Sequence, residues 1–147
     1  MPRIFSPKSL IVGVLFLTLA AGTGHAALTQ WQAQVASQLN AIRTALAAYG
    51  FVLSDADCVQ LRRKSGFERQ VTLAAGVDYA FAIACDHDCS RATLNVYDQN
   101  GHAVGESFGN SPIVVVTPRW TGPFRLTANL AGCWEVTCEV GVALFRR

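Results

Sequence analysis

No stretch of this 147-residue sequence is apolar for the roughly 20 residues that a membrane-spanning helix needs. The longest apolar run, residues 10–21, covers 12 residues, follows two basic residues and is succeeded by small residues up to Ala26. This pattern is typical of a bacterial Sec signal peptide, residues 1–26, whose cleavage leaves no transmembrane anchor. An uncleaved anchor helix is the alternative. Residues 1–26 contain no twin arginine, and no cysteine lies near the cleavage site to mark a lipoprotein.

An excess of charge of one sign is also absent once the signal is removed. The chain has 12 Lys and Arg against 10 Asp and Glu, and loss of Arg3 and Lys8 leaves 10 of each sign. A neutral domain lacks the basic footprint of a nucleic-acid-binding protein. The one basic cluster, Arg62-Arg63-Lys64, is either a solvated loop or a contact for an anionic surface.

The zinc-protease motif H-E-x-x-H is missing from the sequence. Two groups remain as catalytic candidates: Cys89 with His87, and the carboxylate pair Glu135 and Glu139. A disulfide would remove the thiolate that a cysteine nucleophile needs. The alternation of the two glutamates with valines indicates an outward strand face, and His102, after an Asn-Gly turn, is expected in solvent. We therefore expect no enzymatic activity, with a small secreted enzyme as the competing class.

Residues 28–49 have the periodicity of an amphipathic helix, which we place within residues 27–52. Thr29 is suited to the N-cap and Gly50 to the C-terminal end, while Gln34 and Gln38 fall on the polar side. The apolar stripe either packs against its own domain or binds a partner. The candidate partner-binding residues are Leu28, Trp31, Val35, Leu39, Ile42 and Leu46, and Tyr49 continues the stripe.

After a linker at residues 53–65, residues 66–147 alternate with a period of two between Gly, Pro, Asn and Asp breaks. Asn100-Gly101 predicts a hairpin turn, and the β-branched run at 113–116 predicts a central strand. Six or more short strands with frequent turns predict a mainly β protein. The expected fold is an antiparallel, jelly-roll-like β-sandwich preceded by one amphipathic helix.

All five cysteines lie outside the signal, a distribution that indicates disulfides in an oxidising compartment. Cys85 with Cys89, and Cys133 with Cys138, would each close a short loop, and a Cys85 to Cys133 pairing is the alternative. Cys58 is the odd cysteine, either a buried free thiol or a link between two copies of the chain. The cluster at residues 85–89 also suggests a metal site, which disulfide formation would oppose.

Three segments resemble the bacterial pre-peptidase C-terminal (PPC) domain. They are residues 70–81 (QVTLAAGVDYAF), 94–101 (LNVYDQNG) and 118–126 (PRWTGPFRL), and the resemblance covers about residues 66–146. It implies a jelly-roll β-sandwich that serves as a secreted, non-catalytic module in secretion, targeting or substrate contact.

Some PPC domains bind calcium through acidic residues before the strand that corresponds to residues 94–98. By that resemblance Asp86, Asp88 and Asp98 are the candidate calcium ligands here, and we expect no other cofactor. The sequence departs from the family at residues 90–93 (SRAT), where acids would be expected. Calcium takes six to eight oxygen ligands, and an arginine in the loop opposes a dication.

The expected function is that of an exported, non-catalytic binding or accessory module, periplasmic or secreted, whose ligand the sequence does not name. A protein or envelope component is the expected partner, and a homo-oligomer also fits. The alternative is a structural subunit of a cell-envelope or surface assembly that docks through the N-terminal helix.

Overall fold

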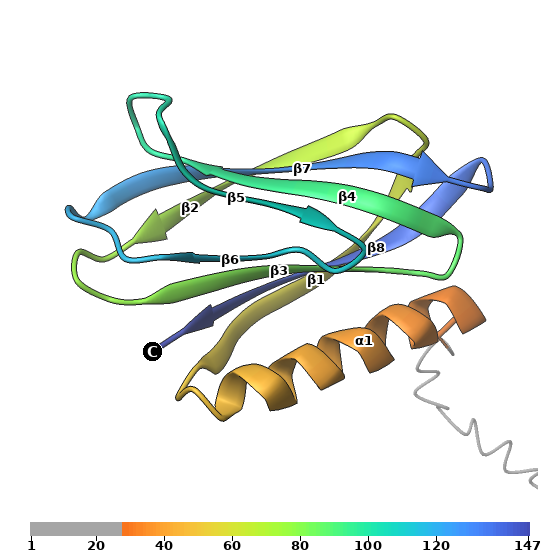
Figure 1. The fold of residues 1–147 in the computed structure, drawn as a ribbon, viewed down its shortest axis with the longest axis horizontal. Coiled ribbons are helices and arrows are strands. Elements are labelled where there is room, and N and C mark those ends of the chain that lie inside the picture. The colour runs from red at the N-terminus through yellow and green to blue at the C-terminus, as the bar shows by residue number, and fades with distance from the viewer. Residues whose placement is uncertain (1–27) are drawn as a thin grey trace, which may run out of the picture.

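The computed structural model describes residues 28–147, so the predicted signal peptide lies outside the described residues. Two four-stranded antiparallel sheets pack face to face, and a helix covers the outer face of one of them (Figure 1). Sheet A has the order β1-β8-β3-β6, and sheet B has the order β2-β7-β4-β5. The predicted β-sandwich preceded by a helix is therefore confirmed. The elements are α1 (Gln30–Ala47), β1 (Val52–Arg62), β2 (Gly66–Leu73), β3 (Tyr79–Cys85), β4 (Cys89–Tyr97), β5 (Ala103–Gly109), β6 (Ile113–Val116), β7 (Gly122–Cys133) and β8 (Thr137–Arg146).

Helix α1 begins after the predicted N-cap, Thr29, and ends at Ala47, three residues before Gly50. The Thr29 hydroxyl accepts a hydrogen bond from the Gln32 amide, and the Gln32 side chain accepts one from the Thr29 amide. This capping box satisfies two amide groups that the first turn leaves unpaired. Gly50 follows the last turn with a φ of +83°, a left-handed conformation that glycine adopts without steric cost.

The helix packs on a part of sheet A that carries small side chains. Ala80 and Ala82 of β3 lie under α1, and a Cβ atom added at Gly141 of β8 would overlap Val35 and Leu39. Strand β3 is consequently buried on both faces. Two residues of the stripe predicted as partner-binding are thus used within the chain, because Val35 is 1% exposed and Leu46 is also buried. Leu39 and Ile42 pack partly against the same sheet, whereas Leu28 is 64% exposed.

The predicted linker at residues 53–65 is wrong, because most of it forms strand β1. This strand pairs with β8 along its length, from Val52 opposite Arg146 to Arg62 opposite Thr137. Since β1 lies at the edge of sheet A, most of its side chains are exposed and its sequence does not show a clear apolar alternation. Charged residues such as Asp55 and Asp57 are typical of edge strands, where they discourage pairing with another chain.

The run at residues 113–116 forms β6, which lies at the other edge of sheet A and is not the predicted central strand. Val114 and Val116 point into the core, whereas Ile113 and Val115 are exposed. A continuous β-branched run favours a strand, but it does not determine how many neighbours the strand has.

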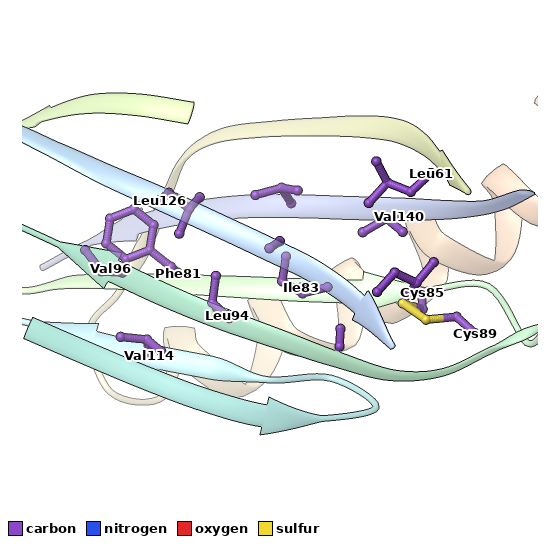
Figure 2. Close-up of a cluster of buried hydrophobic side chains, with 14 of the residues drawn as sticks. Leu61, Phe81, Ile83, Cys85, Cys89, Leu94, Val96, Val114, Leu126 and Val140 are labelled. Carbon is purple, nitrogen blue, oxygen red and sulfur yellow. A yellow bond between two sulfur atoms is a disulfide. The ribbon is translucent and has the colours of Figure 1, made fainter. Parts of the chain in front are cut away.

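The core lies between the two sheets and extends to one end of the sandwich, where the disulfide cysteines complete it (Figure 2). Phe81, Ile83, Leu94 and Leu126 occupy its centre and are at most 1% exposed. Alternation along β3, β4 and β7 supplies these side chains from both sheets.

The close approach of α1 to β8 predicts that Gly141→Ala destabilises the protein. Replacing glycine by alanine in a strand usually stabilises slightly through the unfolded state. Here the added methyl group must displace the helix, at an expected cost of about 1–3 kcal/mol in urea-unfolding free energy. Gly122→Ala is the matched control, because its Cβ would meet no atom closer than 3.6 Å. Equal stability of Gly141→Ala and the wild type would contradict the observed helix packing.

Candidate binding surface at the disulfide end

Three connections between the sheets lie side by side at one end of the sandwich. They are the β1–β2 turn, the β7–β8 loop and the β3–β4 loop. Strands β1, β8 and β3 are neighbours in sheet A, and β2, β7 and β4 are neighbours in sheet B. The β7–β8 loop therefore lies between the other two connections. We call this region, residues 62–65, 85–89 and 133–138, the disulfide end.

Each of two connections is closed by its own disulfide. Cys85 is bonded to Cys89 and Cys133 to Cys138, and all four residues are buried. The local pairings are therefore present, and the alternative Cys85 to Cys133 bond is not formed. These sulfur atoms are not thiolates, so they provide neither the suggested metal ligands nor a Cys89 nucleophile for His87.

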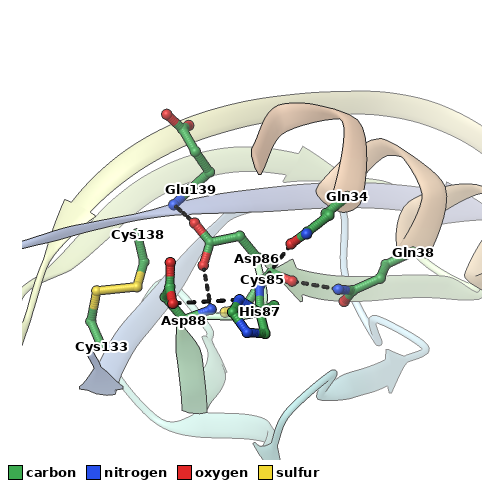
Figure 3. Close-up of polar contacts among 9 residues, drawn as sticks. All are labelled: Gln34, Gln38, Cys85, Asp86, His87, Asp88, Cys133, Cys138 and Glu139. Atoms are coloured by element: carbon green, nitrogen blue, oxygen red, sulfur yellow. Dashed lines mark hydrogen bonds and ion pairs between the residues drawn. A yellow bond between two sulfur atoms is a disulfide. The ribbon is translucent and has the colours of Figure 1, made fainter. Parts of the chain in front are cut away.

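Asp86 fixes the β3–β4 loop to β8. Its carboxylate accepts hydrogen bonds from the amides of Glu139, at 2.7 Å, and Asp88, at 3.1 Å (Figure 3). The side chain is 4% exposed, so both contacts are made in an environment with little water. A buried carboxylate needs such donors, and this one serves to hold the loop in place.

Helix α1 holds the same loop from the other side. The Gln38 side chain donates to the Cys85 carbonyl at 2.6 Å, and the His87 amide donates to the Gln34 side chain at 3.1 Å. The Trp31 indole stacks on the His87 ring with centroids 5.9 Å apart. The sequence placed both glutamines on the polar side of the helix. Nothing in the sequence indicated that they contact a loop about 50 residues away, except that their i, i+4 spacing puts them on the same side of the helix.

The three predicted calcium ligands do not come together. Asp86 and Asp88 precede β4 and Asp98 follows it, so a nine-residue strand of about 30 Å separates them. The Asp98 carboxylate instead accepts hydrogen bonds from the amides of Asn100, at 2.8 Å, and His102, at 2.9 Å, within the predicted hairpin turn. The proposed three-ligand set is therefore wrong. Among residues 28–147, no group of three His, Cys, Asp or Glu side chains is arranged to hold a metal ion.

The β7–β8 loop presents two apolar side chains to solvent. Trp134 is 77% exposed and Val136 is 78% exposed. The backbone beneath them is fixed, because the Trp134 amide donates to the Asp88 carbonyl at 2.9 Å and Arg63 donates to the Cys133 carbonyl at 2.6 Å. We call residues 134–136 the tip. Sequence reasoning named Glu135 as a catalytic candidate but missed Trp134 and Val136, although apolar side chains between closely spaced cysteines were a signal.

Charged residues of both signs lie near the tip. Arg62, Arg63 and Lys64 lie at the β1–β2 turn, and a hollow of about 260 Å³ is lined partly by Arg63 and Trp134. A second hollow, of about 450 Å³, contains the candidate catalytic pair, Glu135 and Glu139. Its other lining residues are Trp31, Gln60, Asp86, Asp88, Val136 and Thr137. The disulfide end thus combines basic, apolar and acidic parts.

Cys58 is a free thiol on the exposed face of β1 and is not the buried cysteine that was one alternative. Its sulfur lies 3.5 Å from a carboxylate oxygen of Glu139. Partial burial, followed by the hydrogen bond and negative charge of Glu139, raises the pKa of the Cys58 thiol to about 11. The thiol is therefore protonated at neutral pH and is a weak nucleophile.

Neither a family model nor a curated protein matches the sequence. The resemblance to PPC domains accordingly remains a prediction from the three segments named above. Two disulfides are typical of a protein that resides in an oxidising compartment. Within residues 28–147, no helix has the length and apolarity to cross a membrane.

The raised pKa of Cys58 predicts slow alkylation. At mildly alkaline pH, iodoacetamide should modify the folded protein about two orders of magnitude more slowly than the unfolded protein, because little thiolate is present. Glu139→Gln should accelerate the reaction by removing the negative charge, and Glu106→Gln on β5 is the control. Mass spectrometry of the modified peptide measures the rate, and equal rates for wild type and Glu139→Gln would contradict this account.

The Asp98 turn predicts a loss of stability in acid. Burial alone would raise the pKa of Asp98, but the His102 and Asn100 amides and the His102 ring together lower it. A lowered pKa adds stability above the unfolded-state value of about 3.9, and this stability is lost as the pH falls through the folded value. Asp98→Asn should therefore be less stable at neutral pH and lose less stability on acidification, as measured by urea unfolding at several pH values.

In the Asp98→Asn protein some acid sensitivity should persist. Hydrogen bonds from Thr117 and Arg147 also lower the pKa of Asp78, which is retained in the variant. Glu106→Gln serves as the control for removing an exposed carboxylate. An Asp98→Asn protein with the acid sensitivity of the wild type would show that the turn carboxylate does not contribute.

Proposed function

We propose that the chain is an exported, non-catalytic binding module of the periplasm or cell exterior, and that its tip contacts a protein or envelope partner. The observation that carries the proposal is the exposure of Trp134 and Val136 on a loop whose backbone is held in place. Exposed apolar clusters mark interaction sites, and tryptophan is enriched among the residues that dominate binding energy. A loop that is already ordered also loses little conformational entropy on binding.

Export is supported by two independent features. The first is the n-region and apolar run of residues 1–26, which has the composition of a Sec signal. The second is the pair of disulfides, which form where thiols are oxidised. An accessory role is also what the resemblance to PPC domains implies.

An assembly that uses the N-terminal helix is disfavoured by the packing of α1. Its stripe covers sheet A, and separating the two would expose the alanines of β3 and the side chains of Val35 and Leu46. Leu28 at the start of the helix remains exposed, but a single exposed apolar residue needs no partner.

Export predicts a shortened protein in the native host. Mass spectrometry of the purified protein should give a chain that begins at Ala27, with the masses of its cysteine peptides showing two disulfides. A chain that retains Met1 would contradict cleavage.

The tip predicts a position-specific contact in the native envelope. Replacing Val136 by the photo-crosslinker p-benzoylphenylalanine should give a discrete adduct after irradiation of cells. The same replacement at Tyr49, which is 69% exposed at the opposite end of the sandwich, is the control and should give none. Absence of an adduct from position 136 would contradict binding through the tip.

A further inference from the structure

We infer that a groove between α1 and β1 binds a free single-chain anionic lipid, such as a fatty acid, with the carboxylate of the lipid at Arg43. The inference is carried by two apolar hollows that join into one groove and by the cation at one end of it. No residue of the tip lines either hollow, so this site is separate from the proposed contact through the tip.

The groove forms because α1 lies over β3 and β8 and leaves the edge strand β1 beside it (Figure 1). One hollow, of about 330 Å³, begins at Leu28 before the helix. The other hollow, of about 380 Å³, reaches Arg43. Ala36, Leu39 and Ala56 line both hollows, which therefore form one continuous groove.

The middle of the groove is apolar and in contact with water. Ala36 on the helix and Ala56 on the strand are exposed, and Leu53 is 40% exposed. Sites for small molecules are concave and lined mainly by apolar side chains, with a few polar groups that fix the orientation of the ligand. An apolar chain that displaces water from this groove gains free energy by the hydrophobic effect.

The length of the groove matches one acyl chain. The helical residues that line it run from Gln32 to Arg43, which is about 17 Å at 1.5 Å per residue. One acyl chain spans about half of the roughly 30 Å hydrocarbon core of a bilayer. A single extended chain therefore fits along the helix with its head group at one end.

The two ends of the groove differ in charge. Of the described residues that line the hollows, Arg43 is the charged one in the first and Asp57 in the second. Arg43 donates to the side-chain oxygen of Asn40 at 2.8 Å, and the ion pairs among residues 28–147 do not include it. A carboxylate at Arg43 would gain charge-assisted hydrogen bonds, whereas Asp57 would repel a carboxylate at the other end. The two charges thus determine the direction of an anionic chain.

A free lipid fits this groove better than an intact membrane surface does. An anionic bilayer would bring many phosphate groups against β1, where the carboxylates of Asp55 and Asp57 are exposed and would be repelled. A free fatty acid carries one negative charge, which Arg43 can meet.

Titration with dodecanoate tests the inference. Calorimetry of the purified protein should give one site with a dissociation constant of about 10–100 µM, because one acyl chain supplies only modest affinity. The affinity should rise at least about twofold with each added methylene from octanoate to dodecanoate, since the chain is removed from water. Dodecanol, which has the same chain without the charge, should bind at least about fivefold more weakly.

Two variants test the two parts of the groove. Ala36→Phe places a ring where the hollows meet and should abolish binding, whereas Ala41→Phe, an exposed position of α1 that lines neither hollow, should not. Arg43→Glu should weaken dodecanoate binding at least about tenfold and leave dodecanol binding unchanged. Arg119→Glu makes the same change in net charge outside the groove and should bind dodecanoate as the wild type does. All four positions lack buried side chains, and circular dichroism would verify folding.

Cys58 provides a readout within the groove, because it lines the first hollow. Saturating dodecanoate should slow alkylation of the Cys58 thiol at least about fivefold, since the bound chain excludes the reagent from this side chain. In Arg43→Glu the same concentration of dodecanoate should leave the rate of alkylation nearly unchanged.

Absence of dodecanoate binding at millimolar concentration would overturn the inference, as would binding that is independent of chain length or unchanged in Ala36→Phe. Sedimentation of the protein with phosphatidylglycerol vesicles that is lost in Ala36→Phe would also overturn it and assign the groove to a bilayer surface. Self-association that is lost in Ala36→Phe would overturn it and assign the groove to a second copy of the chain. The photo-crosslink at position 136 tests the tip separately, so either proposal can fail without the other.

Discussion

The packing of α1 against sheet A determines both the fold and the surface that remains for other molecules. The helix can lie over β3 and β8 because alanines and Gly141 face it, where larger side chains would hold it away. This position brings Gln34 and Gln38 to the β3–β4 loop and Trp31 onto His87. It also covers the most apolar side chains of the helix. The apolar side of the helix that faces sheet A is consequently not free to bind a partner, whereas the apolar side chains of the tip are exposed.

Features that depend on neighbouring residues were predictable from the sequence. The capping box at Thr29, the hairpin at Asn100-Gly101 and the two short-range disulfides are each encoded within a few residues. Strand β1 was not predictable in this way, because an edge strand exposes most of its side chains and so lacks the apolar alternation of a buried one. The same limit applies to β6, whose position at an edge depends on which strands pair with it.

The candidate site depends on long-range neighbours, which explains why sequence reasoning found only part of it. Asp86, Asp88 and Asp98 were grouped because they are acidic and close in sequence, yet β4 separates Asp98 from the other two. Two of these carboxylates instead accept backbone hydrogen bonds that shape their own loops. Conversely, Lys64 and Glu135 are about 70 residues apart and meet at one end because β1 pairs with β8. The residue type determines the chemistry of a side chain, whereas the strand pairing determines which other residues lie next to it.

The disulfides link the proposed contact surface to the compartment. A ring as short as that of Cys133 and Cys138 stabilises the fold by only about 2 kcal/mol through loop entropy. Its larger consequence is local, since it holds the base of the tip while Arg63 and Asp88 hold the backbone within it. In a reducing compartment the ring would open, and ordering the loop on binding would then cost affinity. The proposed contact surface would thus reach its final shape where cysteines are oxidised, which is also where the predicted signal peptide would deliver it.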